Sequence, residues 1–495
     1  MPSLPTLATP AAAPHRRRQA AALPALAVGA VALASALLLT LGGCASSAGI
    51  APQAHALEPA GLGLGTGGTP APALAGDWWR AFGDPGLDAL VDRALAGSPG
   101  LQAAQARVAQ AQAAVGGAQA AEGVHVNAEA DLTRERISAN GIYPPPLGGA
   151  NLTVVNTQLG ASWEADFWGR NRAAVEAAIG TERAAQAELQ AARTLLASRV
   201  AATYVQLGRL LAQRDVAERA LAQRDQILSL IRQRVGSGLD TQVELRQGEG
   251  ALPETRQQIE QLDEQITLAR HALAALTAQA PQALDALQAP LNAVQAVPVP
   301  AHVPADLLGR RADITAARWR VEAAGSEIRS ARAGFYPNLD ITAFIGLNSV
   351  GLDRLLRAGS QQRGIGPALT LPIFDAGRLR ANLRGKTAAY DAAVDSYNGA
   401  VIDAVREAAD AIASAQSVAR QQAQQAQAEA AAESAYALAV QRYQAGLGTY
   451  LTVLNAETAV LAQRRLGADL KARALDSQIT LARALGGGYR AQAGA

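Results

Sequence analysis

Apolar and polar residues alternate strictly over four short stretches of this chain. Over residues 339–347 the odd positions are apolar, and the even positions are polar or small with the exception of Phe344. A period of two over this length predicts a β-strand with one apolar and one polar face. The same alternation occurs over residues 124–133, 155–166 and 365–373. We therefore predict two β-hairpins, over about 124–166 and 338–373, with tips at 139–152 and 349–363.

Long runs rich in Ala, Gln, Arg, Glu and Leu follow each hairpin. The run from Trp168 to about Val235 contains no proline and predicts a helix on the order of 100 Å long, whereas globular helices usually have ~10–14 residues. A return helix is predicted over 241–280, with a kink at Pro253. Asp84-Pro85 and Ser98-Pro99 predict the starts of two shorter helices, over 85–95 and 99–121. A second long pair is predicted over 376–445 and 450–485.

Charged and amide side chains recur at every turn of the long helices, which excludes these helices from lipid. A solvent-exposed coiled coil would show a sustained heptad of Leu and Ile, and the Ala- and Gln-rich runs do not clearly show one. Alanine is the commonest apolar residue in them, and small side chains permit close contact between helices. We interpret the helices as a curved wall that continues the strands as a tunnel.

The two halves of the chain are a repeat. The segment Gly169-Arg170-Asn171-Arg172 lies 208 positions before Gly377-Arg378-Leu379-Arg380, and Gly238-Leu239 lies the same distance before Gly446-Leu447. A constant offset across a whole helix indicates internal duplication. We therefore divide the chain into a first repeat over 77–304, a second repeat over 305–487 and a C-terminal tail over 488–495, with tip turns at about 235–240 and 443–449.

The only cysteine of the chain is Cys44. Three arginines, Arg16 to Arg18, and an apolar run over about 20–39 precede it, which is the pattern of a secretory signal. The alternative is an uncleaved transmembrane helix, because the run is about long enough to span a membrane. Leu41-Gly42-Gly43-Cys44 resembles the bacterial lipobox, and this resemblance implies a signal peptide over 1–43, acylation of Cys44, and a lipid-anchored tether over 44–76. Ala45 in the next position points to the outer membrane.

Composition and motifs favour neither catalysis nor nucleic-acid binding. The 495 residues carry a formal net charge of +2, which is too small to attract nucleic acid electrostatically. The five histidines have no metal-ligand spacing, and no nucleophile elbow, paired-carboxylate motif or phosphate loop is present. With Cys44 acylated, no thiol remains. We therefore expect neither an enzyme nor a bound metal or cofactor.

Four two-faced strands cannot close a barrel alone. Closed membrane barrels begin at about 8 strands, and an open sheet edge is not tolerated in lipid. A dimer would supply 8 strands around a filled interior, and a trimer 12 strands around a lumen. The polar faces carry Gly, Asn and Thr rather than bulky fillers, which favours the trimer. Aromatic residues at the helix-side ends of the strands indicate a membrane interface: Phe167, Trp168, Phe335, Tyr336 and Phe374.

Several local motifs make the chain resemble the TolC-like outer-membrane efflux channels, in particular the NodT-type lipoprotein branch that serves resistance-nodulation-division pumps. The resemblance extends from about residue 77 to 485. It implies a mainly α fold with a small β part: a homotrimer with a 12-stranded transmembrane barrel, an α-helical tunnel, and docking to a periplasmic adaptor and an inner-membrane transporter. The motifs are Trp78-Trp79, Phe82-Gly83-Asp84-Pro85, Leu307-Leu308-Gly309-Arg310-Arg311-Ala312-Asp313-Ile314, Ala333-Gly334-Phe335-Tyr336-Pro337, Phe374-Asp375-Ala376-Gly377-Arg378 and Tyr443-Gln444-Ala445-Gly446.

The same resemblance assigns adaptor docking and gating to the two tip turns. Relatives often carry a charged residue where this chain has Gly448, whereas the first repeat offers Asp240. We hypothesise that three copies of Asp240 form an acidic ring, with Arg442 and Tyr443 in the network that locks it. The alternative is that Asp240 merely caps the return helix. The candidate tip residues are Val235, Gly236, Ser237, Gly238, Leu239, Asp240, Arg442, Tyr443, Gly446, Leu447, Gly448 and Thr449.

The function predicted from the sequence is a passive duct of the cell outer membrane, with a large periplasmic part, in a tripartite efflux system. It would carry small molecules delivered by an inner-membrane pump and its adaptor. Two alternatives remain open: a secretion channel for a polypeptide, and a periplasmic lipoprotein scaffold that forms no pore.

Overall fold

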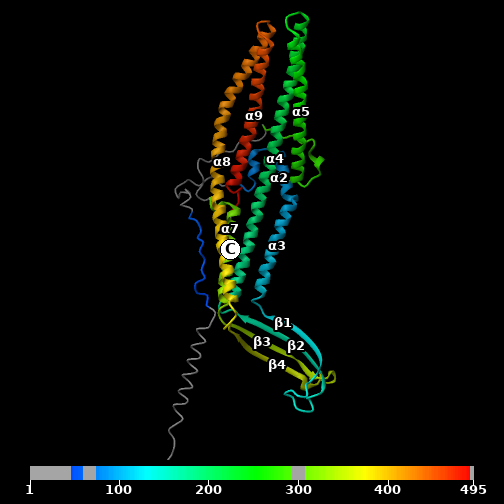
Figure 1. The fold of residues 1–495 in the computed structure, drawn as a ribbon, viewed down its shortest axis with the longest axis vertical. Coiled ribbons are helices and arrows are strands. Elements are labelled where there is room, and N and C mark those ends of the chain that lie inside the picture. Colours follow the sequence, from blue (N-terminus) through cyan, green and yellow to red (C-terminus); the bar gives the residue numbers. More distant parts are fainter. Residues whose placement is uncertain (1–45, 59–73, 292–306, 491–495) are drawn as a thin grey trace, which may run out of the picture. The chain divides into compact units, whose positions relative to one another are not determined.

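The computed structural model describes residues 46–58, 74–291 and 307–490 (Figure 1). The predicted signal peptide and Cys44 lie outside these residues. The chain divides into two compact units, which are described separately. One contains the strands, within 124–170 and 331–385, together with the segment that ends at Ile50; the other contains residues 51–123, 171–330 and those from Lys386 on.

Four antiparallel strands form one sheet in the order β1-β2-β3-β4. They are β1 (His125–Arg136), β2 (Asn151–Ala165), β3 (Asn338–Val350) and β4 (Gln361–Thr370). All four strands predicted from the alternation are confirmed, and the two hairpins lie side by side through β2 and β3. β1 and β4 are the edges of the sheet.

The register of the sheet places the predicted apolar sets on one face. Val126 lies opposite Ala161, Ala161 opposite Ala343, and Ala343 opposite Ile365, so one apolar row crosses all four strands. On the other face, the amide of Gln158 donates to Glu129 at 3.3 Å. Successive strand residues point to opposite faces, and the sheet therefore has one apolar and one polar side.

Phe344, the exception to the alternation, lies on the polar face between two glycines. Its cross-strand partners are Gly160 on β2 and Gly364 on β4. A Cβ atom on Gly364 would lie 2.7 Å from Cε1 of the Phe344 ring. The ring therefore occupies space that any larger residue at position 364 would need.

Polar side chains cap the N-termini of the first two α-helices of the helical unit, α2 (Pro85–Gly97) and α3 (Pro99–Ala120). The Asp84 carboxylate accepts from the amides of Gly86 and Leu87 at 2.8 and 3.3 Å. Ser98 caps α3 by accepting from the amide of Leu101 at 3.5 Å. Both helices have proline at their start, where its missing N–H costs nothing, and the predicted starts are confirmed.

The long helices have equal lengths in the two halves. α4 (Arg170–Gly236) and α8 (Arg378–Gln444) each have 67 residues, and the return helices α5 (Gln242–Leu276) and α9 (Tyr450–Ala484) each have 35. Two further helices, α6 (Leu307–Arg310) and α7 (Ala312–Ala333), precede β3. Glycine with positive φ precedes each long helix, 72° at Gly169 and 86° at Gly377. The matching lengths confirm the repeat.

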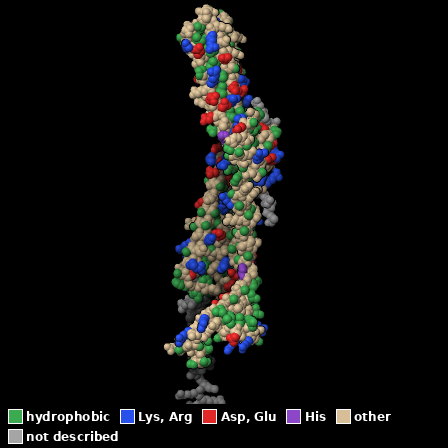
Figure 2. Space-filling view, turned by 90° about the vertical axis from the view of Figure 1, so that its right-hand side faces the viewer, with side chains coloured by type: hydrophobic (Ala, Val, Ile, Leu, Met, Phe, Trp, Pro, Cys, Tyr) green, Lys and Arg blue, Asp and Glu red, His purple; other side chains and the backbone are tan. Residues whose placement is uncertain are grey.

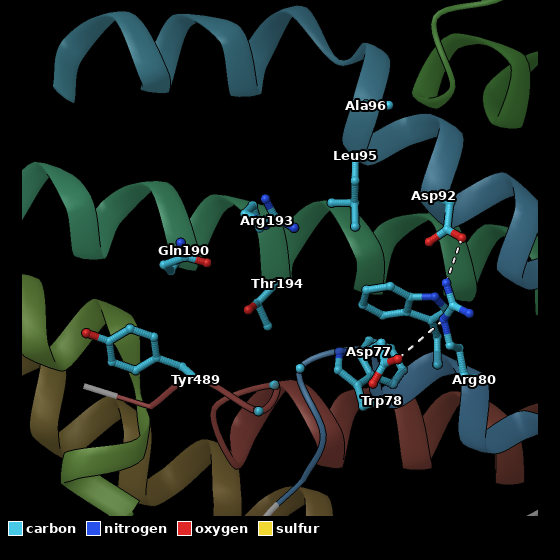
Figure 3. Close-up of a pocket in the computed structure, with 14 residues that line it drawn as sticks. Asp77, Trp78, Arg80, Asp92, Leu95, Ala96, Gln190, Arg193, Thr194 and Tyr489 are labelled. Carbon is cyan, nitrogen blue, oxygen red and sulfur yellow. Dashed lines mark hydrogen bonds and ion pairs between the residues drawn. The ribbon is translucent and has the colours of Figure 1, made fainter. Parts of the chain in front are cut away.

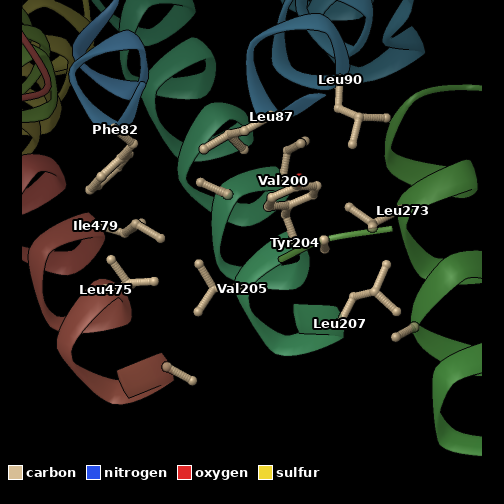
Figure 4. Packing of buried hydrophobic residues seen from close by; sticks show 14 of the residues in the cluster. Phe82, Leu87, Leu90, Val200, Tyr204, Val205, Leu207, Leu273, Leu475 and Ile479 are labelled. Carbon is tan, nitrogen blue, oxygen red and sulfur yellow. The ribbon is translucent and has the colours of Figure 1, made fainter. Parts of the chain in front are cut away.

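The main core of the helical unit joins its N-terminal residues to three long helices (Figure 4). Phe82 and Leu87 pack with Tyr204 of α4, Leu273 of α5 and Ile479 of α9. Burial of each large apolar side chain contributes about 1.5–3 kcal/mol. The Tyr204 hydroxyl donates to Asp84 at 2.8 Å, so this core also holds the cap of α2.

Part of the predicted tether is attached to α8. The amides of Gln53 and Ala54 donate to Asp391 at 2.9 and 3.0 Å. The amide of Leu57 donates to Asn398 at 2.9 Å, and the Asn398 amide group donates back to the carbonyl of His55. The described residues 53–57 of this segment are therefore held against α8 by hydrogen bonds.

Candidate functional site

The turns between α4 and α5 and between α8 and α9 share one backbone geometry. The Leu239 amide donates to the Arg234 carbonyl, and the Leu447 amide to the Arg442 carbonyl, both at 2.8 Å. These bonds close the helix ends by a Schellman-type turn, which needs a residue in the left-handed region. Gly238 and Gly446 supply it, with φ of 73° and 75°. The 208-residue offset therefore relates the two turns.

The first turn continues into α5 through a capping box. Thr241 accepts from the amide of Val243 at 3.1 Å, and Glu244 accepts from the amide of Thr241 at 2.9 Å. Thr241, not Asp240, is thus the N-cap, and the alternative in which Asp240 merely caps the return helix is wrong. The spacing Thr-x-x-Glu is a sequence signal that identifies this cap.

Asp240 instead pairs with Arg234 on α4. The guanidinium donates through Nε and Nη2 to the two carboxylate oxygens at 3.0 and 3.2 Å. The side chains are only 14% and 10% exposed. Two parallel charge-assisted bonds of this kind are stronger and more directional than a single bond.

Tyr443 joins this pair from the other helical hairpin. Its hydroxyl donates to Oδ2 of Asp240, and its ring lies under the Arg234 guanidinium at 4.7 Å from the ring centroid. Arg234 also donates to the Tyr443 carbonyl at 3.3 Å. Tyr443 is fully buried. We call Arg234, Asp240 and Tyr443 the tip triad; it connects α4–α5 to α8–α9 within one copy of the chain.

The charges of the tip triad are set by its hydrogen bonds. Although burial raises the pKa of Asp240, hydrogen bonds from Arg234 and Tyr443 together hold it below its ordinary value. Burial, followed by the bond to Asp240, raises the pKa of Tyr443, so its hydroxyl remains a donor. The triad is therefore an ion pair with a neutral phenol at neutral pH.

Arg442 does not take the place that we expected for it. Its guanidinium donates to the Leu447 carbonyl at 3.4 Å, within its own turn. The arginine in the network is Arg234, which lies 208 positions before Arg442 and is its repeat equivalent. The offset was the signal that could have identified Arg234. The repeat equivalents of Asp240 and Tyr443 are Gly448 and Val235, so the triad can form only once per chain.

Leucines at both turns present apolar surface to solvent. Leu239 is 66% exposed and Leu447 is 70% exposed, and these two residues are repeat equivalents. Gly236, Ser237, Gly446 and Thr449 are also exposed, whereas Val235 packs against the core cluster that contains Tyr443. The turns therefore combine a buried polar contact with paired apolar projections.

A second buried ion pair connects three helices. Arg224 of α4 donates to Glu457 of α9 at 2.9 Å, and the two side chains are 15% and 7% exposed. The same guanidinium donates to the Ala251 carbonyl and to the Thr255 hydroxyl on α5, at 3.1 and 2.8 Å. This ion pair holds α9 against both α4 and α5.

The predicted interface aromatics differ in exposure. Trp168 stacks on Tyr336 at 4.4 Å and donates from its indole to the Pro337 carbonyl at 2.9 Å. Phe167 and Phe374 are exposed, but Phe335 is buried and does not present its ring at the surface. Phe335 is therefore a packing residue of this unit.

A hollow of about 600 Å³ lies where residues near 77 meet the C-terminal glycines (Figure 3). Arg80 pairs there with Asp77 at 3.4 Å and with Asp92 at 2.9 Å. These side chains are about half exposed, so the pairs contribute little to stability. Over the described ranges, no group of three potential ligands could hold a metal ion, and no helix is long and apolar enough to cross a membrane.

Comparisons with known proteins agree on one family. The family model described as "Outer membrane efflux protein" matches residues 90–279 and 303–487. The chain is 39% identical to "Fusaric acid resistance protein FusA" of Burkholderia cepacia over 369 residues, 73% of this chain and 70% of FusA. It is 32% identical to "Multidrug resistance outer membrane protein MdtP" of Escherichia coli over 422 residues, 84% of this chain and 86% of MdtP. The crystal structure of the outer membrane protein VceC from Vibrio cholerae superposes with a TM-score of 0.79 and 36% identity, over 83% of this chain and 98% of VceC.

Proposed function

The chain belongs to the outer membrane efflux protein family, and from this premise we propose that three copies form the exit duct of one tripartite pump. The family's channels are trimers that work with efflux pumps, and they are not enzymes. The partners proposed for this chain are a periplasmic adaptor and an inner-membrane transporter of the resistance-nodulation-division class. The proposed cargo is small molecules, because the relatives are named for resistance to several drugs and to fusaric acid.

The two-faced sheet with open edges is the observation that carries this function. Among the described residues, β1 and β4 each have a partner on one side only. Three such sheets supply the 12 strands of a ring with a polar interior. The apolar positions of β1 and the residue before it, from Val124 to Leu132, extend about 26 Å along the strand. At a strand tilt of about 35–45° this length covers roughly 18–21 Å of the ~25 Å apolar band of membrane barrels.

The tip triad is the proposed lock of the closed duct. It joins α4–α5 to α8–α9 within each copy, so the two hairpins cannot separate while Asp240 remains bonded. The exposed Leu239 and Leu447 beside it are proposed to dock the adaptor, since paired apolar projections are suited to packing in a groove. Adaptor binding would then act directly beside the lock.

Acylation of Cys44 is the proposed membrane anchor. In the strand-containing unit, the Arg380 guanidinium donates to the carbonyls of Ser46 and Ala48. These contacts hold Ser46 and Ala48 at the first turn of α8, close in sequence to the exposed Phe374. An acyl chain together with the sheet would give stable attachment.

Single-channel recording tests the duct. The purified protein should elute as a trimer in detergent and should insert into planar bilayers with uniform, low-conductance steps. A chain whose lipid-free Cys44→Ala variant is monomeric and water-soluble, and forms no steps, would be the pore-free scaffold instead.

A further inference from the structure

The apolar face of the sheet ends in arginine on both edge strands. On β1, the first residue of this face beyond the apolar positions, toward the hairpin tip, is Arg134, and Arg136 is the next. On β4 the corresponding residue is Arg363. The inner strands have hydroxyl residues at this place, Thr153 and Ser349. We call the three arginines the arginine margin. Figure 2 shows hydrophobic side chains gathered over the sheet, at the lower end of the view, with basic side chains at the edge of that area.

The arginines on the two edges are offset along the strands by six residues, since the cross-strand row of Arg363 meets β1 at Ala128. On this face, Arg134 lies one cross-strand row nearer the hairpin tip than Val155, and Val155 lies opposite Ser349. On the other edge, Arg363 lies opposite Ile345. The last apolar residues share a row on β1 and β2, lie two residues earlier on β3, and lie four residues earlier again on β4. A strand tilt of about 35–45° accounts for about 10–14 Å of the roughly 20 Å offset between Arg134 and Arg363, so tilt brings the two edges closer to one level.

Within the described part of the chain, the arginine margin has no protein partner. Arg134, Arg136 and Arg363 are exposed, and their side chains take part in no hydrogen bond or ion pair. The nearest acids in sequence, Asp131 and Glu135, have the opposite parity and lie on the polar face. Arginine on the lipid face is costly at the middle of a bilayer and nearly free near the headgroups. The margin thus offers unused donors at headgroup level.

A hollow whose exposed surface is mainly apolar leads to Arg363 on the same face. It has a volume of about 630 Å³ and includes Ala128, Leu159, Ile345 and Leu347 before reaching Arg363, and its lining also contains Glu129, Thr157, Gln158, Gln361 and Gln362. Ala128, Leu159 and Ile345 share one cross-strand row with Arg363, so their side chains line the apolar side. A hollow of this kind suits an acyl chain whose charged end lies beside the guanidinium.

The two edges of one sheet are too far apart to share a headgroup. Three strand spacings of about 4.8 Å separate β1 from β4, or roughly 14 Å. Ring closure brings β1 of one copy beside β4 of the next, and the directions of the two strands allow antiparallel pairing. Arg134 and Arg136 then lie on one side of the junction and Arg363 on the other.

We propose that the arginine margin binds the phosphate headgroup of a membrane lipid at each junction between copies. Guanidinium groups bind phosphate through two parallel hydrogen bonds, and the apolar hollow takes one acyl chain. This inference rests on the proposed trimeric duct, because Arg134 and Arg363 come from neighbouring copies. The bound lipid joins two copies where no covalent link does.

Native mass spectrometry of the detergent-purified trimer tests the site. The probes are phosphatidic acid and a diacylglycerol with the same acyl chains. We expect the trimer to retain phosphatidic acid at least tenfold more than diacylglycerol, with a plateau at three molecules. The R134Q/R136Q/R363Q variant should lose this preference, and R134Q/R136Q and R363Q should each lower retention. Excess inorganic phosphate should compete poorly, because it lacks the acyl chain.

A matched control replaces three exposed arginines of the helices, Arg107, Arg256 and Arg420, for which the described structure shows no ion pair. R107Q/R256Q/R420Q has the same change in charge and should retain phosphatidic acid like the unmodified protein. Equal retention of the two lipids, or full retention of phosphatidic acid by R134Q/R136Q/R363Q, would overturn the lipid site. If the protein in that experiment still has a trimeric mass and conducts in bilayers, the proposed duct is unaffected. A monomeric mass without conductance overturns both.

Discussion

The Tyr443 hydroxyl of one helical hairpin donates a hydrogen bond to the Asp240 carboxylate of the other. Arg234 pairs with the same carboxylate through two bonds, so a single acid holds both hairpins. The contact lies within one copy and is almost completely buried. It places the proposed lock between hairpins of one chain, whereas the acidic ring expected from the sequence would need Asp240 from three chains.

Removing Asp240 should loosen the tip. Asp240→Ala leaves Arg234 buried without its partner, a change that costs about 3–5 kcal/mol for buried pairs, and should raise single-channel conductance. Tyr443→Phe removes one bond to a charged group, worth about 1.5–3 kcal/mol, and should have a smaller effect in the same direction. Arg442→Gln is the control, because the Arg442 guanidinium donates its hydrogen bond within its own turn, to the Leu447 carbonyl. Unchanged conductance in Asp240→Ala would contradict the lock.

Acid should open the tip only at low pH. The pKa of Asp240 is lowered in the folded protein, so its contribution to stability is complete above the unfolded value of about 3.9 and is lost as the pH falls through the lower folded value. Conductance attributable to this group should stay constant from neutral pH down to about pH 5 and rise only below about pH 4. Asp240→Asn should remove the pH-dependent part of the conductance. This part is measured as the difference between the pH titrations of the unmodified protein and of the variant. A rise centred near neutral pH would assign the opening to another group.

The Arg224–Glu457 pair should show the asymmetry of a buried ion pair. Glu457→Ala leaves the Arg224 guanidinium with only its longer, 3.9 Å contact to the exposed Glu254, and should lower the unfolding free energy by up to about 3–5 kcal/mol. Replacing both residues by methionine should be far less harmful, because no buried charge remains. Denaturant unfolding of the detergent-solubilised protein measures both. Equal losses in the two variants would show that packing, not charge, governs this contact.

Alanine at position 364 should displace the Phe344 ring. A Cβ atom there would lie 2.7 Å from the outer edge of the ring, which is 41% exposed, so we expect a loss at or below the lower end of the ~1–3 kcal/mol that overpacking costs in a core. The double variant Gly364→Ala/Phe344→Ala removes the clash and should recover much of the loss, as measured by thermal dissociation of the trimer. Gly366→Ala is the matched control on the same strand, since nothing lies within 4 Å of its Cβ position.

Local features of the fold could be predicted from the sequence because neighbouring residues determine them. The alternation around Ile341 and Ile365 predicted the strands, and Asp84 and Ser98 predicted the helix starts, since side-chain period and capping act over a few residues. The Thr241–Glu244 cap carried an equally local signal. The predicted acylation of Cys44 and the adaptor contacts of Leu239 and Leu447 stay predictions.

The sequence by itself determined the two-faced strands, the long helices and the duplication, because periodicity and a constant offset are properties of the chain. Only the tertiary structure decided that Arg234 rather than Arg442 pairs with Asp240, and that Phe335 is buried. It also placed Phe344 over Gly364 and the arginines on one face. These outcomes depend on strand register and on which side chains two distant helices bring together, and no local pattern specifies such pairings.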